Sequence, residues 1–95
     1  MRIRAYATLR DLLRTGKFDM PLDATPDAPA MVGQVMDRLV EAHPALAAKL
    51  WADDGHLTGY ITILLNGRSI EYLRGMATPV TDGDTLSLFP PVGGG

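Results

Sequence analysis

The residues with the clearest potential for chemistry stand at the end of the chain, Pro90-Pro91-Val92-Gly93-Gly94-Gly95. Glycine has no Cβ, so consecutive glycines can pass through a narrow channel and adopt backbone angles that other residues avoid. They present the α-carboxylate of Gly95, which is ionised at neutral pH. The two prolines form a stiff stem before the glycines. We therefore expect a folded domain over residues 1–90 and a flexible tail over residues 91–95 that enters another protein's active site.

Composition narrows the classes of function. The chain has 95 residues, of which 46% are hydrophobic and 21% are charged, as in ordinary single globular domains. A formal net charge of −2 argues against nucleic acid as a partner. Apolar stretches such as residues 61–65 are too short to cross a bilayer, and the first residues do not resemble a signal peptide. We therefore expect a cytoplasmic protein with no membrane partner.

The sequence offers few groups for catalysis or metal binding. It contains no cysteine, which excludes disulfides, thiolate metal sites and cysteine nucleophiles on this chain. His43 and His56 stand thirteen positions apart without ligand-spaced partners, and we interpret both as structural or solvated. No glycine-rich phosphate loop, nucleophile elbow or paired-carboxylate motif is present. We expect no metal site, and a protein co-substrate rather than an enzyme.

Two strands are expected to open the chain. Residues 2–7 alternate in polarity, which is the period of a half-buried strand. The side chains expected to point inward are Ile3, Ala5 and Ala7. Residues 8–14 are interpreted as a connection with one helical turn. Residues 17–22 alternate again and are expected to pair with the first strand as a hairpin.

The period then changes to that of a helix. After a loop over residues 23–29, apolar residues recur at i, i+3, i+4, i+7 and i+8, the stripe of an amphipathic helix. They are Val32, Val35, Met36, Leu39 and Val40. Pro44 either ends this helix or begins the next. Residues 45–51 predict a second short helix, and Asp53-Asp54-Gly55 predicts a turn.

The last third of the chain predicts three further strands. Residues 60–65 give the strongest strand pattern, with Ile61, Ile63 and Leu65 on one face. Asn66-Gly67 predicts a tight turn that leads into a short return strand over residues 68–72. A loop over residues 75–79 and a turn at Asp82-Gly83-Asp84 precede the last strand. That strand covers residues 85–89, with Leu86 and Leu88 inward.

This order predicts an α+β fold, a mixed sheet of four to five strands with one main helix and a second short helix. A right-handed crossover places the first and last strands side by side. This is the β-grasp arrangement of ubiquitin. In that arrangement the last strand carries the C-terminus out into solvent.

The chain resembles the ThiS/MoaD family of ubiquitin-like sulfur-carrier proteins in two blocks, residues 3–13 and 63–95. The second block is the specific one, because the D-G-D turn, the alternating last strand and the P-P-V-x-G-G end recur at the family's spacing. Gly93 departs from the family, whose members commonly have another small residue there. Residues 23–58 show no match, and this middle looks longer than in the smallest thiamine-type carriers.

The resemblance implies a function. A ubiquitin-activating-like enzyme, holding ATP and Mg²⁺, adenylates the Gly95 carboxylate, which is then converted to a thiocarboxylate. The sulfur passes to an acceptor such as a synthase large subunit. The long middle favours a molybdopterin-synthase small subunit, or the related carriers of cysteine biosynthesis, over a thiamine carrier. A ubiquitin-like protein modifier, or an inert interaction module with a fortuitous tail, are the alternatives.

Strand alternation also nominates a docking surface for that partner. Leu64 and Phe89 are expected on the sheet face opposite the helix, with Arg4, Tyr6 and Thr62 nearby. Burial of large apolar side chains there offsets the entropy lost on ordering the tail. The alternative is that Phe89 belongs to the core.

Overall fold

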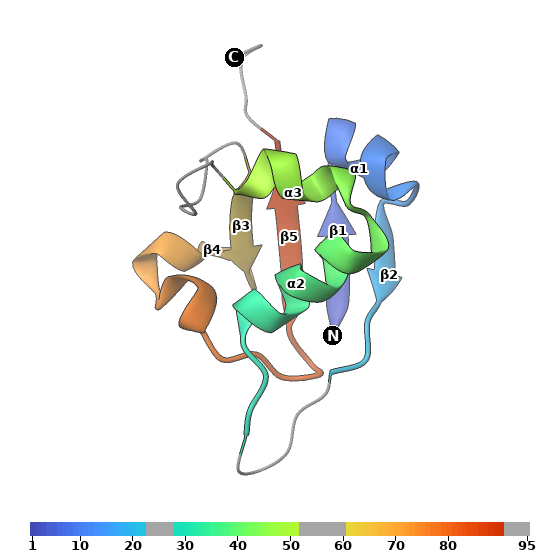
Figure 1. The fold of residues 1–95 in the computed structure, drawn as a ribbon. Helices are drawn as coiled ribbons and strands as arrows, with labels where there is room; N and C mark the ends of the chain where they lie inside the picture. The colour runs from blue at the N-terminus through green and yellow to red at the C-terminus, as the bar shows by residue number, and fades with distance from the viewer. Residues whose placement is uncertain (23–27, 52–60, 91–95) are drawn as a thin grey trace.

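The computed structural model describes residues 1–22, 28–51 and 61–90. Within these ranges the chain forms a five-stranded sheet, three α-helices and two short 3-10 helices (Figure 1). In chain order they are β1 (Arg2–Ala5), α1 (Thr8–Leu13), β2 (Lys17–Asp19), α2 (Val32–Ala42), α3 (Ala45–Leu50), β3 (Thr62–Leu65), β4 (Arg68–Ser69), η1 (Ile70–Tyr72), η2 (Gly75–Ala77) and β5 (Thr85–Phe89).

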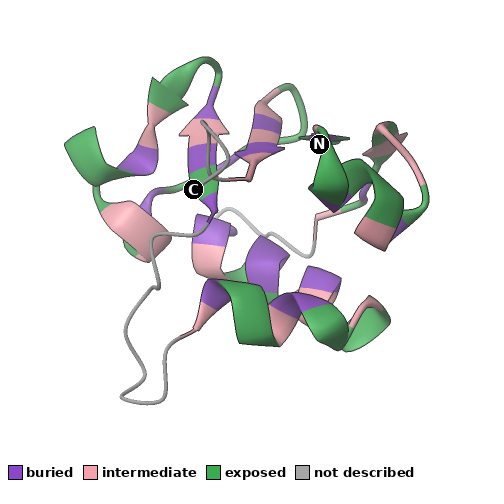
Figure 2. Cartoon of the chain, turned by 90° about the horizontal axis from the view of Figure 1, so that it is seen from above, coloured by how far each residue is buried: buried purple, intermediate pink, exposed green. Residues whose placement is uncertain are grey.

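The strands lie in the order β2-β1-β5-β3-β4. β1 and β5 run parallel at the centre, whereas the other neighbouring strands are antiparallel. α2 and α3 lie across one face of the sheet, and Figures 1 and 2 show them on the same side. This is the mixed sheet of a ubiquitin-like β-grasp fold, and the predicted fold class is confirmed.

The core lies between the sheet and these helices. At the centre of the sheet, Ile3 pairs with Leu86, and Leu88 pairs with Ile63. Ile3, Leu86 and Leu88 are each 0% exposed. The buried residues of α2 are Val32, Val35, Met36 and Leu39, spaced as the helical pattern predicts. The strands and the main helix therefore present the apolar faces that the sequence assigns to them.

The first strand is shorter than predicted, and Ala7 does not point inward. β1 ends at Ala5, and Ala7 is exposed, with φ 52° and ψ −127°, at the start of α1. The segment interpreted as a connection with one helical turn is a six-residue helix. Its Leu9 and Leu13 are buried one above the other, because residues i and i+4 share a helix face. The chain therefore leaves the sheet early to bury these leucines.

The return strands are also shorter than predicted. β2 stops at Asp19, although Met20 remains buried and its N–H donates to the Met1 carbonyl at 2.8 Å. β4 stops at Ser69, whose Oγ accepts a 3.3 Å hydrogen bond from the Glu71 N–H and so caps η1. Side-chain capping of this kind competes with strand pairing. The expected loop at residues 75–79 contains η2.

The predicted turns and the second helix are placed as follows. Asn66 and Gly67 both have positive φ, 51° and 86°, as a two-residue hairpin turn requires. Pro44 stands at the N-cap of α3, directly after His43 at the C-cap of α2. The expected turn at residues 53–55, His56 and most of the loop at residues 23–29 lie outside the described residues.

In the described part of the chain, no helix is long and apolar enough to cross a membrane. The longest helix there, α2, has 11 residues. A spanning helix needs about 20 residues.

Candidate functional site

One face of the sheet is left uncovered by α2 and α3, and the side chains nominated from the sequence lie on it. The strand register places Thr62 opposite Phe89, and Ser87 between Arg4 and Leu64. Tyr6 follows β1 directly, and its N–H donates to the Leu88 carbonyl at 3.2 Å, which continues the ladder. We call this surface the open face; its residues are Arg4, Tyr6, Thr62, Leu64, Ser87 and Phe89.

Phe89 and Tyr6 form an aromatic pair on the open face. Their ring centroids are 4.3 Å apart, and the ring planes differ by 4°. Both residues are half-buried, whereas the neighbouring Leu88 is 0% exposed on the other side of the strand. Phe89 therefore lies outside the buried core. The pair presents a rigid apolar surface of the type that forms the centre of many protein interfaces.

Leu64 adds a second apolar group to the open face. It is half-buried, and its strand neighbours are Ser87 on β5 and Ser69 on β4. Because these serines are small, part of the Leu64 side chain stays exposed between them. The structure thus brings Leu64, Thr62, Tyr6 and Phe89 onto one surface.

The tail begins beside the aromatic pair. β5 ends at Phe89, and Pro90 follows as a half-buried residue outside the strand. Figure 1 shows β5 at the centre of the sheet, pointing toward the end of the molecule that carries α1. Pro91, together with the three glycines Gly93, Gly94 and Gly95, lies outside the described residues. Pro90, the last described residue, therefore lies directly after the end of β5.

A polar cleft that the sequence did not predict borders the open face. Its volume is about 560 Å³, and Arg4, Tyr6, Arg10 and Lys17 line it together with Gly16. We call it the cationic cleft, after Arg4, Arg10 and Lys17. Arg4 also lies over Tyr6, with its guanidinium carbon 5.8 Å from the ring centroid. The sequence gives little indication of this cleft. Arg10 and Lys17 come close to Arg4 only through the pairing of β1 with β2 and the path of α1.

A carboxylate network fixes the base of β5. Asn66 Nδ2 donates to Asp84 Oδ1 at 2.9 Å, and the Thr81 N–H donates to Asp84 Oδ2 at 2.8 Å. Asn66 Oδ1 in turn accepts from the Thr85 N–H at 3.0 Å. The hydrogen bond from Asn66 is the main cause that lowers the pKa of Asp84, because it stabilises the charged carboxylate. This network joins the β3–β4 turn to the start of β5 and so supports the open face.

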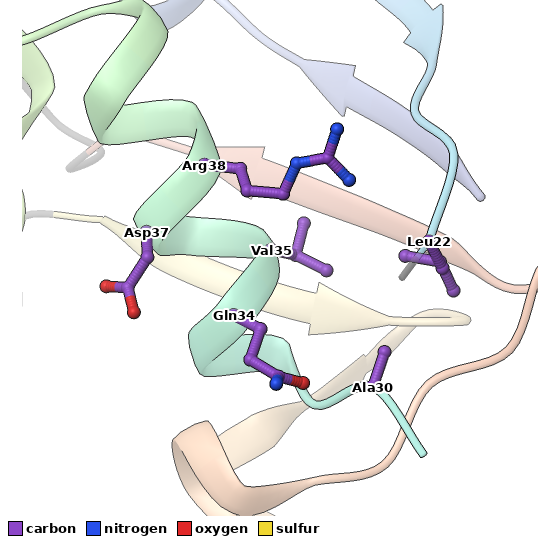
Figure 3. A pocket seen from close by; sticks show the side chains of 6 residues that line it. All are labelled: Leu22, Ala30, Gln34, Val35, Asp37 and Arg38. Atoms are coloured by element: carbon purple, nitrogen blue, oxygen red, sulfur yellow. The ribbon is translucent and has the colours of Figure 1, made fainter. Parts of the chain in front are cut away.

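A second cavity lies on the helix side of the sheet. It has a volume of about 230 Å³ and borders α2, with Val35, Leu22 and Ala30 among its lining residues (Figure 3). Arg38 crosses this region and donates a hydrogen bond to the Pro21 carbonyl, while the Asp37 side chain points away from that of Arg38. The cavity lies away from the end of β5 at Phe89.

The described residues contain no group of three or more His, Asp or Glu side chains arranged to hold a metal ion. His43 is half-buried at the end of α2, where it caps the helix.

Comparison with known proteins places the chain in a family. The model of the ThiS family matches residues 3–95. Small archaeal modifier protein 1 of Haloferax volcanii is 41% identical over 97 aligned positions, which span 100% of both chains. Its crystal structure covers 100% of this chain and 98% of its own, with a TM-score of 0.81 and 35% identity.

Two further relatives are a modifier protein and a sulfur carrier. Small archaeal modifier protein 3 of Haloferax volcanii is 36% identical over 95 residues, which cover 100% of this chain and 98% of that protein. Sulfur carrier protein CysO of Mycobacterium tuberculosis is 27% identical over 66 residues, which cover 67% of this chain and 71% of that protein. The relatives are small ubiquitin-like carrier and modifier proteins. On the full-length family match and these identities, the chain belongs to the ThiS family.

Proposed function

We propose that this chain is a sulfur carrier whose Gly95 carboxylate is adenylated and then converted to a thiocarboxylate. The observation that carries the proposal is the place where β5 ends. β5 ends at Phe89, within the Tyr6–Phe89 pair on the open face, and the sequence of this member of the ThiS family continues from there as Pro-Pro-Val-Gly-Gly-Gly. β5 thus contributes Phe89 to the proposed docking surface and is followed in the sequence by the reactive terminus at Gly95.

The proposed chemistry has two steps. A Gly95 carboxylate oxygen attacks the α-phosphorus of ATP, pyrophosphate leaves, and an acyl-adenylate forms. A sulfur nucleophile then attacks the acyl carbon, and AMP leaves, so that one oxygen is replaced by sulfur. Activation of this kind splits one difficult substitution into two easier steps. Because the chain has no cysteine, it cannot carry sulfur as a persulfide, and the terminal carbonyl carbon is the proposed carrier atom.

In this proposal the partner enzyme supplies the catalytic groups. A ubiquitin-activating-like enzyme holds ATP and Mg²⁺, and this chain is its protein substrate. Gly93 and Gly94 let the terminus reach the α-phosphate without side-chain clashes. Residues 1–90 act as the docking domain, and residues 91–95 act as the tail, with Pro90 and Pro91 as its stem.

The open face offsets part of the entropy lost on ordering the tail. Immobilising the backbone of the four residues Val92 to Gly95 costs about 4–8 kcal/mol, at about 1–2 kcal/mol each. Burial of a large apolar side chain contributes about 1.5–3 kcal/mol. Phe89, Tyr6 and Leu64 are already half-buried in the free chain, so their complete burial supplies part of that amount, and Arg4 and Thr62 at the margin of the contact add to it.

For the sulfur acceptor, we propose the large subunit of a molybdopterin synthase, so that the sulfur enters the molybdenum cofactor. Cysteine biosynthesis is the alternative acceptor pathway. Either route takes place in the cytoplasm and involves neither nucleic acid nor a membrane. A stable complex with a synthase large subunit would support the molybdenum route.

A second candidate function is protein modification. It is favoured by the 41% and 36% identity to two proteins named as small archaeal modifiers, over the whole length of the chain. In this reading a lysine amine attacks the activated Gly95 carbonyl, AMP leaves, and an isopeptide bond forms. Both candidate functions begin with the same adenylate.

Intact-protein mass spectrometry tests the proposal. The full chain is incubated with ATP, Mg²⁺, the adenylating enzyme of the same organism and a sulfide source. We expect a mass gain of one sulfur minus one oxygen, which a variant lacking Gly95 does not show. An adenylate without sulfur, together with Gly95 remnants on lysines of other proteins, would favour the modifier. An unchanged mass with every adenylating enzyme of the organism would refute both.

A further inference from the structure

Two cations stand directly opposite each other on the first two strands. Arg4 of β1 pairs with Lys17 of β2 in the antiparallel register, and both residues are exposed. Like charges at directly opposite positions destabilise a sheet, whereas opposite charges stabilise it. The pair two residues away is favourable, because Arg2 faces Asp19 and its Nε donates to the carboxylate at 3.2 Å. The Arg4–Lys17 pair therefore destabilises this part of the sheet.

A third cation joins this pair from α1. Arg10 lies over Gly16, where an added Cβ would come within 2.8 Å of the Arg10 Cδ atom. The missing side chain of Gly16 leaves room for Arg10 to extend from the helix toward the start of β2. Arg10, Arg4 and Lys17 then line the cationic cleft. Three separate elements of the fold thus contribute a positive charge to one cleft.

These three charges have no carboxylate partner in residues 1–22, 28–51 and 61–90. The ion pairs recorded there join Met1 to Asp82 and Arg2 to Asp19. The cluster is also opposite in sign to the chain as a whole, whose formal net charge is −2. A cluster of like charges that has no carboxylate partner and destabilises its own sheet indicates that it binds another molecule.

The cleft adjoins the start of the tail. Arg4 lies 5.8 Å from the centroid of the Tyr6 ring, and Tyr6 stacks on Phe89, the last residue of β5. Tyr6 therefore belongs to both the cleft and the aromatic pair. An anionic group bound in the cleft would sit beside the point where the chain leaves the sheet at Pro90.

We propose that the cationic cleft receives acidic side chains of the enzyme that adenylates Gly95, an inference that rests on the proposed function. Carboxylates in the cleft remove the repulsion between Arg4 and Lys17 when the complex forms. They also raise the rate of productive encounter, because complementary charges steer and orient proteins that approach each other. The aromatic pair then supplies the apolar contact, and the cleft sets the direction in which the tail enters the enzyme.

The test is the variant Lys17→Glu in the full chain. The measurement is ATP–pyrophosphate exchange by the purified adenylating enzyme of the same organism, with this chain as the varied substrate. We expect KM to rise about tenfold with kcat unchanged, because the substitution affects encounter and docking rather than chemistry. Added salt should narrow the difference, because it screens the charges.

Thermal unfolding separates an effect on docking from an effect on folding, because Lys17→Glu should weaken the first and not the second. A carboxylate at position 17 faces Arg4 as a favourable cross-strand pair, so we expect the melting temperature of Lys17→Glu to equal or exceed that of the wild type. The variant should therefore be at least as stable as the wild type and yet a poorer substrate. The milder variant Lys17→Ala should raise KM by about threefold, since it removes a charge without reversing it.

Arg68→Glu is the matched control. It makes the same change in net charge on an exposed residue of β4, at the opposite edge of the sheet. We expect its KM to stay within about twofold of the wild type.

Each other outcome has a distinct meaning. Equal KM values for Lys17→Glu and Arg68→Glu, with the wild type adenylated, would refute this inference and leave the proposed function standing. A lower KM for Lys17→Glu would indicate that the cleft holds the chain's own terminal carboxylate, and would also refute it. Failure of the wild type to be adenylated would refute the proposed function and this inference together.

Discussion

The ring of Phe89 lies almost parallel to that of Tyr6, with 4.3 Å between the ring centroids and 4° between the planes. The two residues come from opposite ends of the sequence and meet because β1 and β5 are parallel neighbours. This contact connects the last strand, and hence the tail, to the first strand. It also gives the open face an ordered apolar centre before any partner binds.

Replacement of Phe89 by alanine should separate docking from folding. A stacked aromatic pair contributes about 0.5–1.5 kcal/mol, and Phe89 is only half-buried, so we expect a modest loss in the free energy of unfolding. Binding can bury only the part of Phe89 that is still exposed, so the loss of about 1 kcal/mol of apolar burial in the complex should raise KM for adenylation about fivefold. Urea unfolding and ATP–pyrophosphate exchange give the two values.

Leu86→Ala is the contrasting variant. Leu86 is 0% exposed on the other side of the same strand, so its truncation should cost about 2–5 kcal/mol of stability. If Phe89→Ala destabilised the protein as much as Leu86→Ala does, Phe89 would have a core role and the open face would lose its central residue.

Asp84 should make the stability of the protein dependent on pH in the acid range. Its pKa is lowered in the folded protein, mainly by the hydrogen bond from Asn66. The stabilisation is therefore fully present above the unfolded reference value of 3.8 and is lost as the pH falls through the folded pKa. In Asp84→Asn we expect a loss of about 1 kcal/mol at neutral pH, since the amide group cannot accept from both Asn66 and the Thr81 N–H.

The pH series of these two proteins is the decisive comparison. At neutral pH, urea unfolding should give a higher free energy of unfolding for the wild type than for Asp84→Asn. The two free energies should converge as the pH falls below 3.8. A constant difference down to acid pH would show that the charge of Asp84 contributes nothing to the network.

The central elements of the fold could be predicted from periodicity because burial decides them. The alternation of Leu86 and Leu88 and the helical stripe from Val32 to Leu39 both follow from facing one shared core. Asn66-Gly67 could be predicted because positive φ is required at both positions of the turn. In each case the local sequence and the tertiary structure favour the same conformation.

The boundaries of the edge elements could not be predicted in the same way. The alternation of polarity continues to Ala7, yet the strand ends at Ala5, because Leu9 and Leu13 gain more burial from a helix. The open face could be predicted, since alternation alone places Phe89 and Leu64 opposite the core. The cationic cleft could not, because it depends on the register between β1 and β2 and on the path of α1.

The conformation of Ala7 predicts a stabilising substitution. Its φ of 52° combined with ψ of −127° is a region that L residues rarely adopt and glycine adopts freely. We expect Ala7→Gly to raise the free energy of unfolding by about 1 kcal/mol, as relief of the strain exceeds the added entropy of the unfolded chain. Ala48→Gly, at an exposed position of α3, should instead lower it by about 0.5–1 kcal/mol. Equal losses in both variants would show that Ala7 is not strained.

Gly16→Ala tests the geometry of the cationic cleft without changing any charge. The new Cβ would come within 2.8 Å of the Arg10 Cδ atom, so the flexible Arg10 side chain must move away. The fold should tolerate this, because the φ of Gly16 lies outside the positive region and the nearest contact of the new Cβ beyond the Arg10 side chain, Ala5 O, is 3.9 Å away. We therefore expect little change in melting temperature and a severalfold rise in KM for adenylation, as one of the three cations leaves the cleft.

Gly83→Ala is the control for that variant, because a Cβ on Gly83 meets nothing within 4 Å and its φ is also outside the positive region. It should leave both the melting temperature and KM unchanged. If Gly16→Ala behaved in the same way, the position of Arg10 would not matter for docking, and the contribution of α1 to the cationic cleft would have to be abandoned. A rise in KM that disappears in high salt would instead show that Arg10 acts through its charge, because screening removes electrostatic steering and leaves apolar contacts in place.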